Sequence, residues 1–252
     1  MNRRHFGAEV LGLLPIYALL DDLLSRDLLA AGVRPITDRW LAELDEASRG
    51  LVGRTFSPSD WQARVEALFR RVPLPELLRQ VDLERVAKQI GTPEPAATAK
   101  RVRLPGLSGL PGPEAFATKV FAVPRGGAIV PHGHRNMVSM HVLLAGEVRL
   151  RHFDRVADEP GALVLRPTID RTAQAGDLSS ISDQRDNVHW FEVRRGPAFT
   201  LDVIIDGLDP ALGFPYRIDF VDPDRAAAAG NGLFRAPVIP YAEAVARYTR
   251  PS

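Results

Sequence analysis

The hydrophobic pattern of this chain changes near residue 92, and that change restricts its fold more than any other feature of the 252 residues. Before it, apolar residues such as Trp61, Val65 and Leu68 recur at helical spacing and form one face. After it, short apolar segments alternate with glycine and proline, which is typical of an antiparallel sandwich or barrel. The sequence therefore predicts an α+β protein in which helices come first and a β-barrel follows.

Start and stop signals place three helices within residues 1–92, a region whose only histidine is His5. Ser and Thr suit helix N-caps, Pro suits the first turn and Gly ends helices. The region holds no cluster of chemically active groups, so we expect it to be a cap, a packing element or an oligomerisation surface. The predicted helices run through Trp40 and Ala47 after a Thr37 cap, from Ser57-Pro58-Ser59-Asp60, and from Pro75 to Gly91.

Residues 93–113 are dense in proline and glycine, which interrupt helices and central strands. We therefore divide the chain into a helical region (1–92), a connector (93–113) and a barrel with a C-terminal extension (114–252). Besides a last helix at Tyr241–Tyr248, the expected strands are Phe116–Val123, Met137–Ala145, Glu147–Phe153, Ala162–Leu165, Val188–Val193 and Phe199–Ile205.

The composition excludes several classes of function. Lys and Arg number 32 against 31 Asp and Glu, so there is no overall basic field for nucleic acid. The absence of cysteine excludes disulfides, thiolate metal sites and a cysteine nucleophile. No apolar run reaches the roughly 18 to 20 residues of a membrane helix. Arg3-Arg4 before an apolar stretch resembles a twin-arginine export signal, but Glu9 within that stretch favours a cytoplasmic protein.

Four of the 6 histidines lie between residues 132 and 152, and His132-Gly133-His134 is the sharpest local feature. Residues at i and i+2 of an extended chain point to the same side. On the inner wall of a barrel the two imidazoles could converge on one ion, and imidazole suits Fe, Zn, Cu and Ni. The alternative is a pair of surface or hydrogen-bonded histidines.

The spacing around these histidines resembles the first motif of the cupin superfamily, whose fold is a jelly-roll-like double-stranded β-helix. Gly126, His132, His134 and Gly146 fall at the intervals of that motif. Ser139 stands where many cupins carry a glutamate ligand. The resemblance implies a C-terminal cupin barrel after the helical region.

Two stretches are similar to the plant cysteine oxidase and 2-aminoethanethiol dioxygenase family, whose members also lack that glutamate. The second stretch keeps the family's order of an R-D-N signature, a G-P-A turn and a strand ending in L-D. This resemblance covers about residues 115–220. The stretches are Pro131-His132-Gly133-His134-Arg135-Asn136-Met137 with the following Val142-Leu143-Leu144-Ala145-Gly146, and Arg185-Asp186-Asn187-Val188-His189 with the following segment from Gly196 to Ile204.

The resemblance implies a mononuclear non-haem iron dioxygenase. In that family three histidines hold a ferrous ion, and by resemblance His132, His134 and His189 take this role here. Open positions on the ion would accept a small thiol or thiol-bearing peptide and dioxygen. Fe(2+) is the expected metal, with Zn, Ni, Mn and Cu as alternatives.

The chain departs from the family after the L-D strand. Members carry an R-D-C stretch there, whereas this chain has Phe214-Pro215-Tyr216. The aspartate that helps to read the substrate amino group is therefore missing from that position, as is the cysteine that forms a cross-link in some members. Tyr216 either fills the space of that cysteine or is a packing residue. A small aminothiol is thus not a secure substrate.

Two more polar residues are candidates for the pocket. Ser139 and His141 are two residues apart and share one face of a strand. His141 is a fourth ligand, a base or proton relay beside the ligands, or a hydrogen-bonded core histidine, and it is our catalytic candidate. Asp202, within a predicted strand, either hydrogen-bonds a loop or lies near the pocket. His152, at a charged strand end, is expected to be exposed.

Two other functions stay open on the sequence. One is a metal-dependent cupin with a non-thiol substrate, because Tyr216 and His141 alter the pocket that the family uses for thiols. The other is a non-catalytic cupin that binds a ligand, with the helical region transmitting or assembling. We also expect a homo-oligomer, because two-sheet cupin barrels often pair and the helical surface is apolar.

Overall fold

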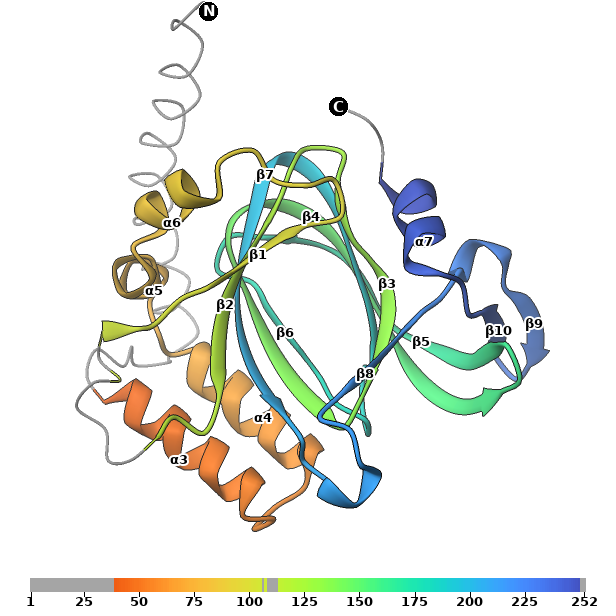
Figure 1. Ribbon diagram of the computed structural model, residues 1–252, viewed down its shortest axis with the longest axis horizontal. Helices are drawn as coiled ribbons and strands as arrows, with labels where there is room; N and C mark the ends of the chain where they lie inside the picture. The colour runs from red at the N-terminus through yellow and green to blue at the C-terminus, as the bar shows by residue number, and fades with distance from the viewer. Residues whose placement is uncertain (1–38, 106, 108–112, 250–252) are drawn as a thin grey trace, which may run out of the picture.

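The computed structural model describes residues 39–105, 107 and 113–249. The predicted Thr37 cap, His5 and the twin-arginine-like start lie outside the described residues. Four helices come first in the described chain, and they cover one side of the barrel (Figure 1). They are α3 (Trp40–Val52), α4 (Pro58–Phe69), α5 (Leu74–Val81) and α6 (Leu83–Ile90).

The predicted start of α4 is confirmed. The Ser57 side chain accepts from the Asp60 backbone N–H, and the Asp60 carboxylate accepts from the Ser57 backbone N–H. Pro58 occupies the first turn, where its missing N–H costs nothing. The single helix predicted from Pro75 to Gly91 is wrong, because Asp82 adopts a left-handed conformation with φ 52°. Asp82 ends α5 and caps α6, so the segment bends.

The strands pair in antiparallel fashion in the order β1-β2-β7-β4-β5-β10-β9, with β3 on β7 and β8, and β6 on β4. Figure 1 shows the sheet curled into a barrel, with helix α7 (Tyr241–Tyr248) on the side away from α3 and α4. The α+β class is confirmed, as is the predicted last helix. The strands are β1 (Thr98–Arg101), β2 (Ala117–Val123), β3 (Ala128–Arg135), β4 (Met137–Glu159), β5 (Ala162–Gln174), β6 (Leu178–Ile181), β7 (Val188–Asp206), β8 (Arg217–Phe220), β9 (Ala227–Gly230) and β10 (Leu233–Pro237).

Two pairs of predicted strands are single long strands, β4 and β7. The glycine expected to separate the first pair, Gly146, lies within β4 at φ +89°, where the register with β7 shifts. A Cβ there would lie 2.7 Å from the carbonyl oxygen of Pro197. Glycine at this position therefore makes a bulge that bends the strand instead of ending it.

One hydrophobic core joins the helices to the barrel. Trp61 of α4 is completely buried in the same cluster as Leu201 and Val203 of β7. Leu104 and Leu107 of the Pro/Gly-rich connector are buried in it as well. The helical region thus packs onto the sheet, and the connector contributes to the core. None of the described helices is long and apolar enough to cross a membrane.

Candidate metal centre

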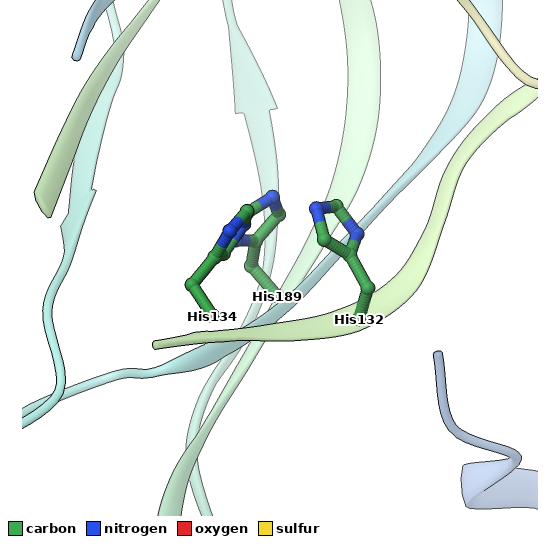
Figure 2. A group of neighbouring side chains, drawn as sticks. All are labelled: His132, His134 and His189. Carbon is green, nitrogen blue, oxygen red and sulfur yellow. The ribbon is translucent and has the colours of Figure 1, made fainter. Parts of the chain in front are cut away.

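Three histidines from two strands converge inside the barrel. His132 and His134 lie on β3, and His189 lies on β7 directly opposite His132 in the antiparallel register. One nitrogen from each ring lies within 4.8 Å of the others. The ring centroid of His132 lies 4.6 Å from that of His134 and 4.3 Å from that of His189. Figure 2 shows the three imidazole rings close together, with those of His132 and His134 on the same side of β3.

Gly133 allows the two strands to approach at this point. A Cβ at this position would lie 2.8 Å from the Asn187 side-chain oxygen and 2.9 Å from a Val188 methyl group. Both contacts are closer than real Cβ atoms show, so with any larger residue the side chains of Asn187 and Val188 would have to shift. The glycine between the histidines is therefore a packing requirement of the site.

Asn187 fixes the backbone of His134. Its side-chain NH2 donates to the carbonyl oxygens of His134 at 2.8 Å and Ser182 at 3.0 Å. Its side-chain oxygen accepts from the His134 backbone N–H at 3.3 Å. Asn187 is 1% exposed, so these bonds replace water for buried backbone groups. One residue of the R-D-N signature thus ties the strand of His134 to the segment that ends in His189.

Helix α4 holds the other side of this segment. The carboxylate of Glu66 accepts from Arg185 and from the Ser180 hydroxyl, both at 2.5 Å. The Gln62 amide donates to Ser180 at 3.1 Å and accepts from Ser182 at 2.6 Å. The helical region therefore positions the loop before His189, which agrees with the predicted packing role.

We expect Asn187→Ala to weaken iron binding about 10- to 100-fold without unfolding the protein. The variant loses the hydrogen bonds that join the backbone of His134 to the segment before His189, while all three imidazoles remain. Competition with a coloured iron chelator under anaerobic conditions measures the affinity. Gln89→Ala, at an exposed position of α6, is the control and should bind iron as the wild type does. Equal affinities in the two variants would contradict the role assigned to Asn187.

Burial keeps the three imidazoles neutral. It lowers the pKa of His132 to about 4 and the pKa values of His134 and His189 well below 6.5. The charges of neighbouring histidines lower these pKa values further. Metal ligation requires neutral imidazole, so at neutral pH no proton has to be displaced.

The nitrogen atoms of the site fit a metal ion. The Nδ1 of His132 donates to the Val130 carbonyl oxygen at 2.7 Å, which leaves its Nε2 with a free lone pair. His134 and His189 each have a buried ring nitrogen, Nδ1, without a hydrogen-bond partner. Buried polar atoms normally have hydrogen-bond partners. A bound metal ion would explain why neighbouring ring nitrogens in this site have none. Three neutral nitrogen donors suit a divalent transition metal such as Fe(2+).

Comparison with known proteins identifies the protein family. The PCO_ADO family matches residues 78–206, just over half of the chain. The chain belongs to the PCO_ADO family. The match begins earlier than the resemblance seen in the sequence, because it includes part of α5, all of α6 and the connector. PCO_ADO proteins are thiol dioxygenases, and the buried three-histidine site is of the kind that holds Fe(2+) in them.

Solved structures show more distant likenesses. Oxalate oxidase in complex with glycolate is 19% identical, with a TM-score of 0.34 over 52% of this chain and 57% of that one. An uncharacterized conserved protein with a double-stranded β-helix domain from Klebsiella pneumoniae is 14% identical, with a TM-score of 0.34 over 47% and 80%. Procruciferin, an 11S globulin from Brassica napus, is 10% identical, with a TM-score of 0.32 over 42% and 22%.

The chain therefore spans about a fifth of procruciferin and just over half of oxalate oxidase. No curated protein matches its sequence. The helices followed by an antiparallel barrel agree with the predicted cupin fold of a PCO_ADO member.

His141 faces the same interior as the proposed ligands. Its ring centroid lies 4.9 Å from that of His189, and its Nδ1 lies 2.8 Å from a carboxylate oxygen of Asp202. It is not in the group whose nitrogens lie within 4.8 Å of one another, so the geometry gives no support to a fourth ligand. Asp202 is buried and bonds side chains within the barrel, not a loop backbone. Ser139 is also buried, and its hydroxyl has no partner.

The expectation that His152 is exposed is wrong. The residue is completely buried on β4, pairs with His189 in the register, and stacks on Phe191 at a centroid distance of 6.2 Å. The alternation of Val148 and Leu150 with arginines puts even-numbered positions of this segment on the inner face. The charged neighbours had suggested a solvated strand end, but Arg149 and Arg151 alternate with the buried positions and so lie on the other face of the strand.

Tyr216 does not fill a buried space. It precedes β8 and is 48% exposed, so it does not replace the family's cysteine in the interior. Sequence reasoning also assigned no role to Asn187, Glu66 and Phe220. The signal for Glu66 was present, since it lies four positions after Gln62, and residues at this spacing share one face of a helix. Both side chains bond Ser180 on the barrel.

Buried neutral imidazoles make the stability of the metal-free protein depend on pH. In the unfolded chain a histidine takes up a proton near pH 6.5, whereas folded His132 does so only near pH 4. Between these values the unfolded state binds more protons, so the free energy of unfolding falls as the pH drops. We expect a melting temperature that is steady above pH 7 and declines from pH 6.5 towards pH 4, measured by circular dichroism.

The variant His152→Leu should reduce this slope, because burial also lowers the pKa of His152 and the variant leaves the three proposed ligands in place. An identical slope in both proteins would contradict the assignment of the pH dependence to the buried histidines.

Proposed function

We propose that this protein is a mononuclear iron thiol dioxygenase. The reaction is R–SH + O2 → R–SO2H, in which both oxygen atoms are transferred to the sulfur, so that sulfur is oxidised and dioxygen is reduced. The observation that carries the proposal is the convergence of His132, His134 and His189 within 4.8 Å in a member of the PCO_ADO family.

The chain's own residues supply the binding site and its environment. His132, His134 and His189 would hold Fe(2+) as three neutral ligands, which leaves the ion its full charge to attract a thiolate. When bound, the iron supplies the dioxygen and electron-transfer chemistry that amino-acid side chains lack. The rigid strands β3 and β7 fix the ligands, and Asn187 ties the backbone around them. Burial excludes water, which strengthens electrostatic attraction within the site.

The test is anaerobic reconstitution with ferrous iron, followed by oxygen uptake with a panel of small thiols and thiol-bearing peptides. We expect one iron per chain, thiol-dependent uptake, and a product that gains two oxygen atoms from labelled dioxygen in mass spectrometry. Failure to retain iron, or uptake that no thiol stimulates, would overturn the proposal.

The same assays separate the alternatives. Uptake that responds to other metabolites but not to thiols would indicate a non-thiol oxygenase. Equal ligand affinity in the wild type and His132→Ala, without uptake, would indicate a non-catalytic binding protein.

We propose further that the protein forms a homo-oligomer. The support is β9, a strand at one edge of the sheet whose four residues Ala227–Gly230 are all exposed. An open, uncharged edge is suited to pairing with a second copy. Analytical ultracentrifugation tests this, and a monomer at all concentrations would contradict it.

A further inference from the structure

Strand β3 has a bulge directly before His132. Between Ile129 and His132 the pairing register advances three positions on β3 but only two on β7. The extra residue falls at Val130-Pro131, and proline suits a bulge because it has no N–H for the ladder. Bulges next to active sites redirect a side chain. Here the Val130 carbonyl oxygen accepts from the Nδ1 of His132 at 2.7 Å, so the bulge sets the orientation of this imidazole.

The C-terminal part of the chain holds this bulge. Val130 is 3% exposed, in a buried cluster with Tyr248 of α7, the helix that lies against β3 (Figure 1). Trp190 of β7 belongs to the same cluster, and its ring centroid lies 4.6 Å from that of Tyr248. The carbonyl oxygen of Pro131 accepts from the Val221 N–H at 3.1 Å. Both residues of the bulge are therefore held by chain that follows β8.

A buried carboxylate joins these contacts to one another. Asp222 directly follows Val221 and is completely buried. It accepts from the Tyr248 hydroxyl at 2.5 Å, and the Nε of Arg247 lies 3.1 Å from its other oxygen. A buried charge needs such partners, and the removal of one of them is strongly unfavourable. The last turn of α7 is thereby tied to the residue beside the one that bonds Pro131.

Helix α7 also reaches His132 through an aromatic contact. In the register of β3 and β8, Phe220 lies opposite His132, and the two ring centroids are 5.7 Å apart. Tyr241, the first residue of α7, contacts Phe220 at a centroid distance of 4.9 Å. The Phe220 carbonyl oxygen accepts from the Ile239 N–H at 2.9 Å. Both ends of α7 thus contact the surroundings of the same proposed ligand.

We propose that residues 221–249 form a C-terminal brace, which holds the bulge of β3 and so orients His132 towards the metal. The brace lies beyond the part of the chain that the family matches, residues 78–206. Tyr248 is its positioning residue, because it contacts Trp190 behind the ligand strands and also donates to the buried Asp222. This role depends on the proposed metal centre and extends beyond the proposed function.

The test measures two properties of variants at Tyr248. One is the affinity for Fe(2+), obtained anaerobically by chelator competition. The other is the visible absorption of the protein loaded with cobalt(2+), whose bands report the arrangement of the ligands. Tyr248→Ala removes the ring from Trp190 and the hydroxyl from Asp222. We expect its iron affinity to fall about 10- to 100-fold and its cobalt bands to shift at saturating metal. Wild-type affinity and bands in folded Tyr248→Ala would overturn the proposal.

The conservative variant Tyr248→Phe keeps the ring but loses the hydroxyl. It should bind iron less tightly than the wild type and more tightly than Tyr248→Ala. Wild-type affinity and bands in Tyr248→Phe would overturn the tie through Asp222, which links α7 to the bulge, whether or not Tyr248→Ala folds.

Leu77→Ala is the control for general destabilisation. Leu77 lies on α5 and is 2% exposed in the core that the helices share with the barrel. The variant should lower the melting temperature yet keep the wild-type iron affinity and cobalt bands. Equal changes of affinity and bands in Leu77→Ala and Tyr248→Ala would overturn the positioning role, because they would follow from lost stability alone.

Metal binding is measured without thiol or dioxygen, so the result does not depend on thiol oxidation. If the wild type binds metal and Tyr248→Ala binds it weakly, but no thiol is oxidised, the brace stands and the proposed function fails. If the wild type binds neither metal, the three-histidine centre fails and the brace with it.

Discussion

The variant His189→Ala is expected to lose iron and, with it, thiol-dependent oxygen uptake. His189 comes from a different strand than the other two proposed ligands, and its ring lies 4.3 Å from that of His132 and 5.2 Å from that of His134. Without it, β3 alone offers two imidazoles, and three-point ligation is impossible. Loss of a group that only orients a ligand costs about 10- to 100-fold in metal affinity. We expect loss of a ligand to exceed that range.

The measurement is iron content after anaerobic purification, together with the rate of oxygen uptake at a saturating thiol concentration. The matched control is His152→Leu, which removes a completely buried histidine that pairs with His189 across the sheet but is not in the converging group. It should retain one iron per chain. A His189→Ala protein with stoichiometric iron would refute the three-histidine centre.

Local chemistry made much of the structure predictable from sequence. The capping residues Ser57 and Asp60 act within four positions of one another, so their pairing does not depend on the rest of the fold. The same holds for His132 and His134, which lie on one side of β3 because the side-chain period of a strand is two. His189 required more than periodicity. It was assigned from the family resemblance, and the structure brings it opposite His132.

The features that were missed depend on contacts between distant segments. Gly146 looked like a strand end, but the passage of the Pro197 carbonyl against it makes it a bulge within β4. His152 looked like a surface residue because its neighbours are charged, whereas alternation places it on the inner face. Asp82 interrupts a continuous apolar pattern by adopting a left-handed conformation, to which the helical periodicity gives no clue.

The partners of Asp202 could not be inferred from the sequence for the same reason. His141 and Asp202 are 61 positions apart and meet because β4 and β7 pair in one particular register. A shift of one strand by one residue would turn its side chain to the opposite face, and the two residues would no longer meet. The chemical environment of the centre is thus set by strand pairing, while the identity of its ligands is set by short motifs.

The variant Trp61→Ala is expected to destabilise the whole molecule, the barrel included. Trp61 is completely buried where α4 meets the barrel, in a core that contains residues of β2, β4 and β7. Its indole N–H has no hydrogen-bond partner, so the loss is one of apolar packing and of the cavity left behind. Such truncations cost about 3 to 5 kcal/mol. Urea unfolding followed by circular dichroism measures the change in the free energy of unfolding.

The control is Val52→Ala, at a residue of α3 that is 55% exposed, where we expect a change of at most about 0.5 kcal/mol in the free energy of unfolding.

Unfolding of the Trp61→Ala variant also tests the predicted boundary at residues 93–113. If the core were divided there, Trp61→Ala would melt the helices and leave the barrel transition unchanged, which would contradict a shared core. Because Leu104 and Leu107 pack into the same cluster, we expect one cooperative transition. Iron affinity should weaken in parallel, since α4 also carries the Gln62 and Glu66 bonds to the loop before His189.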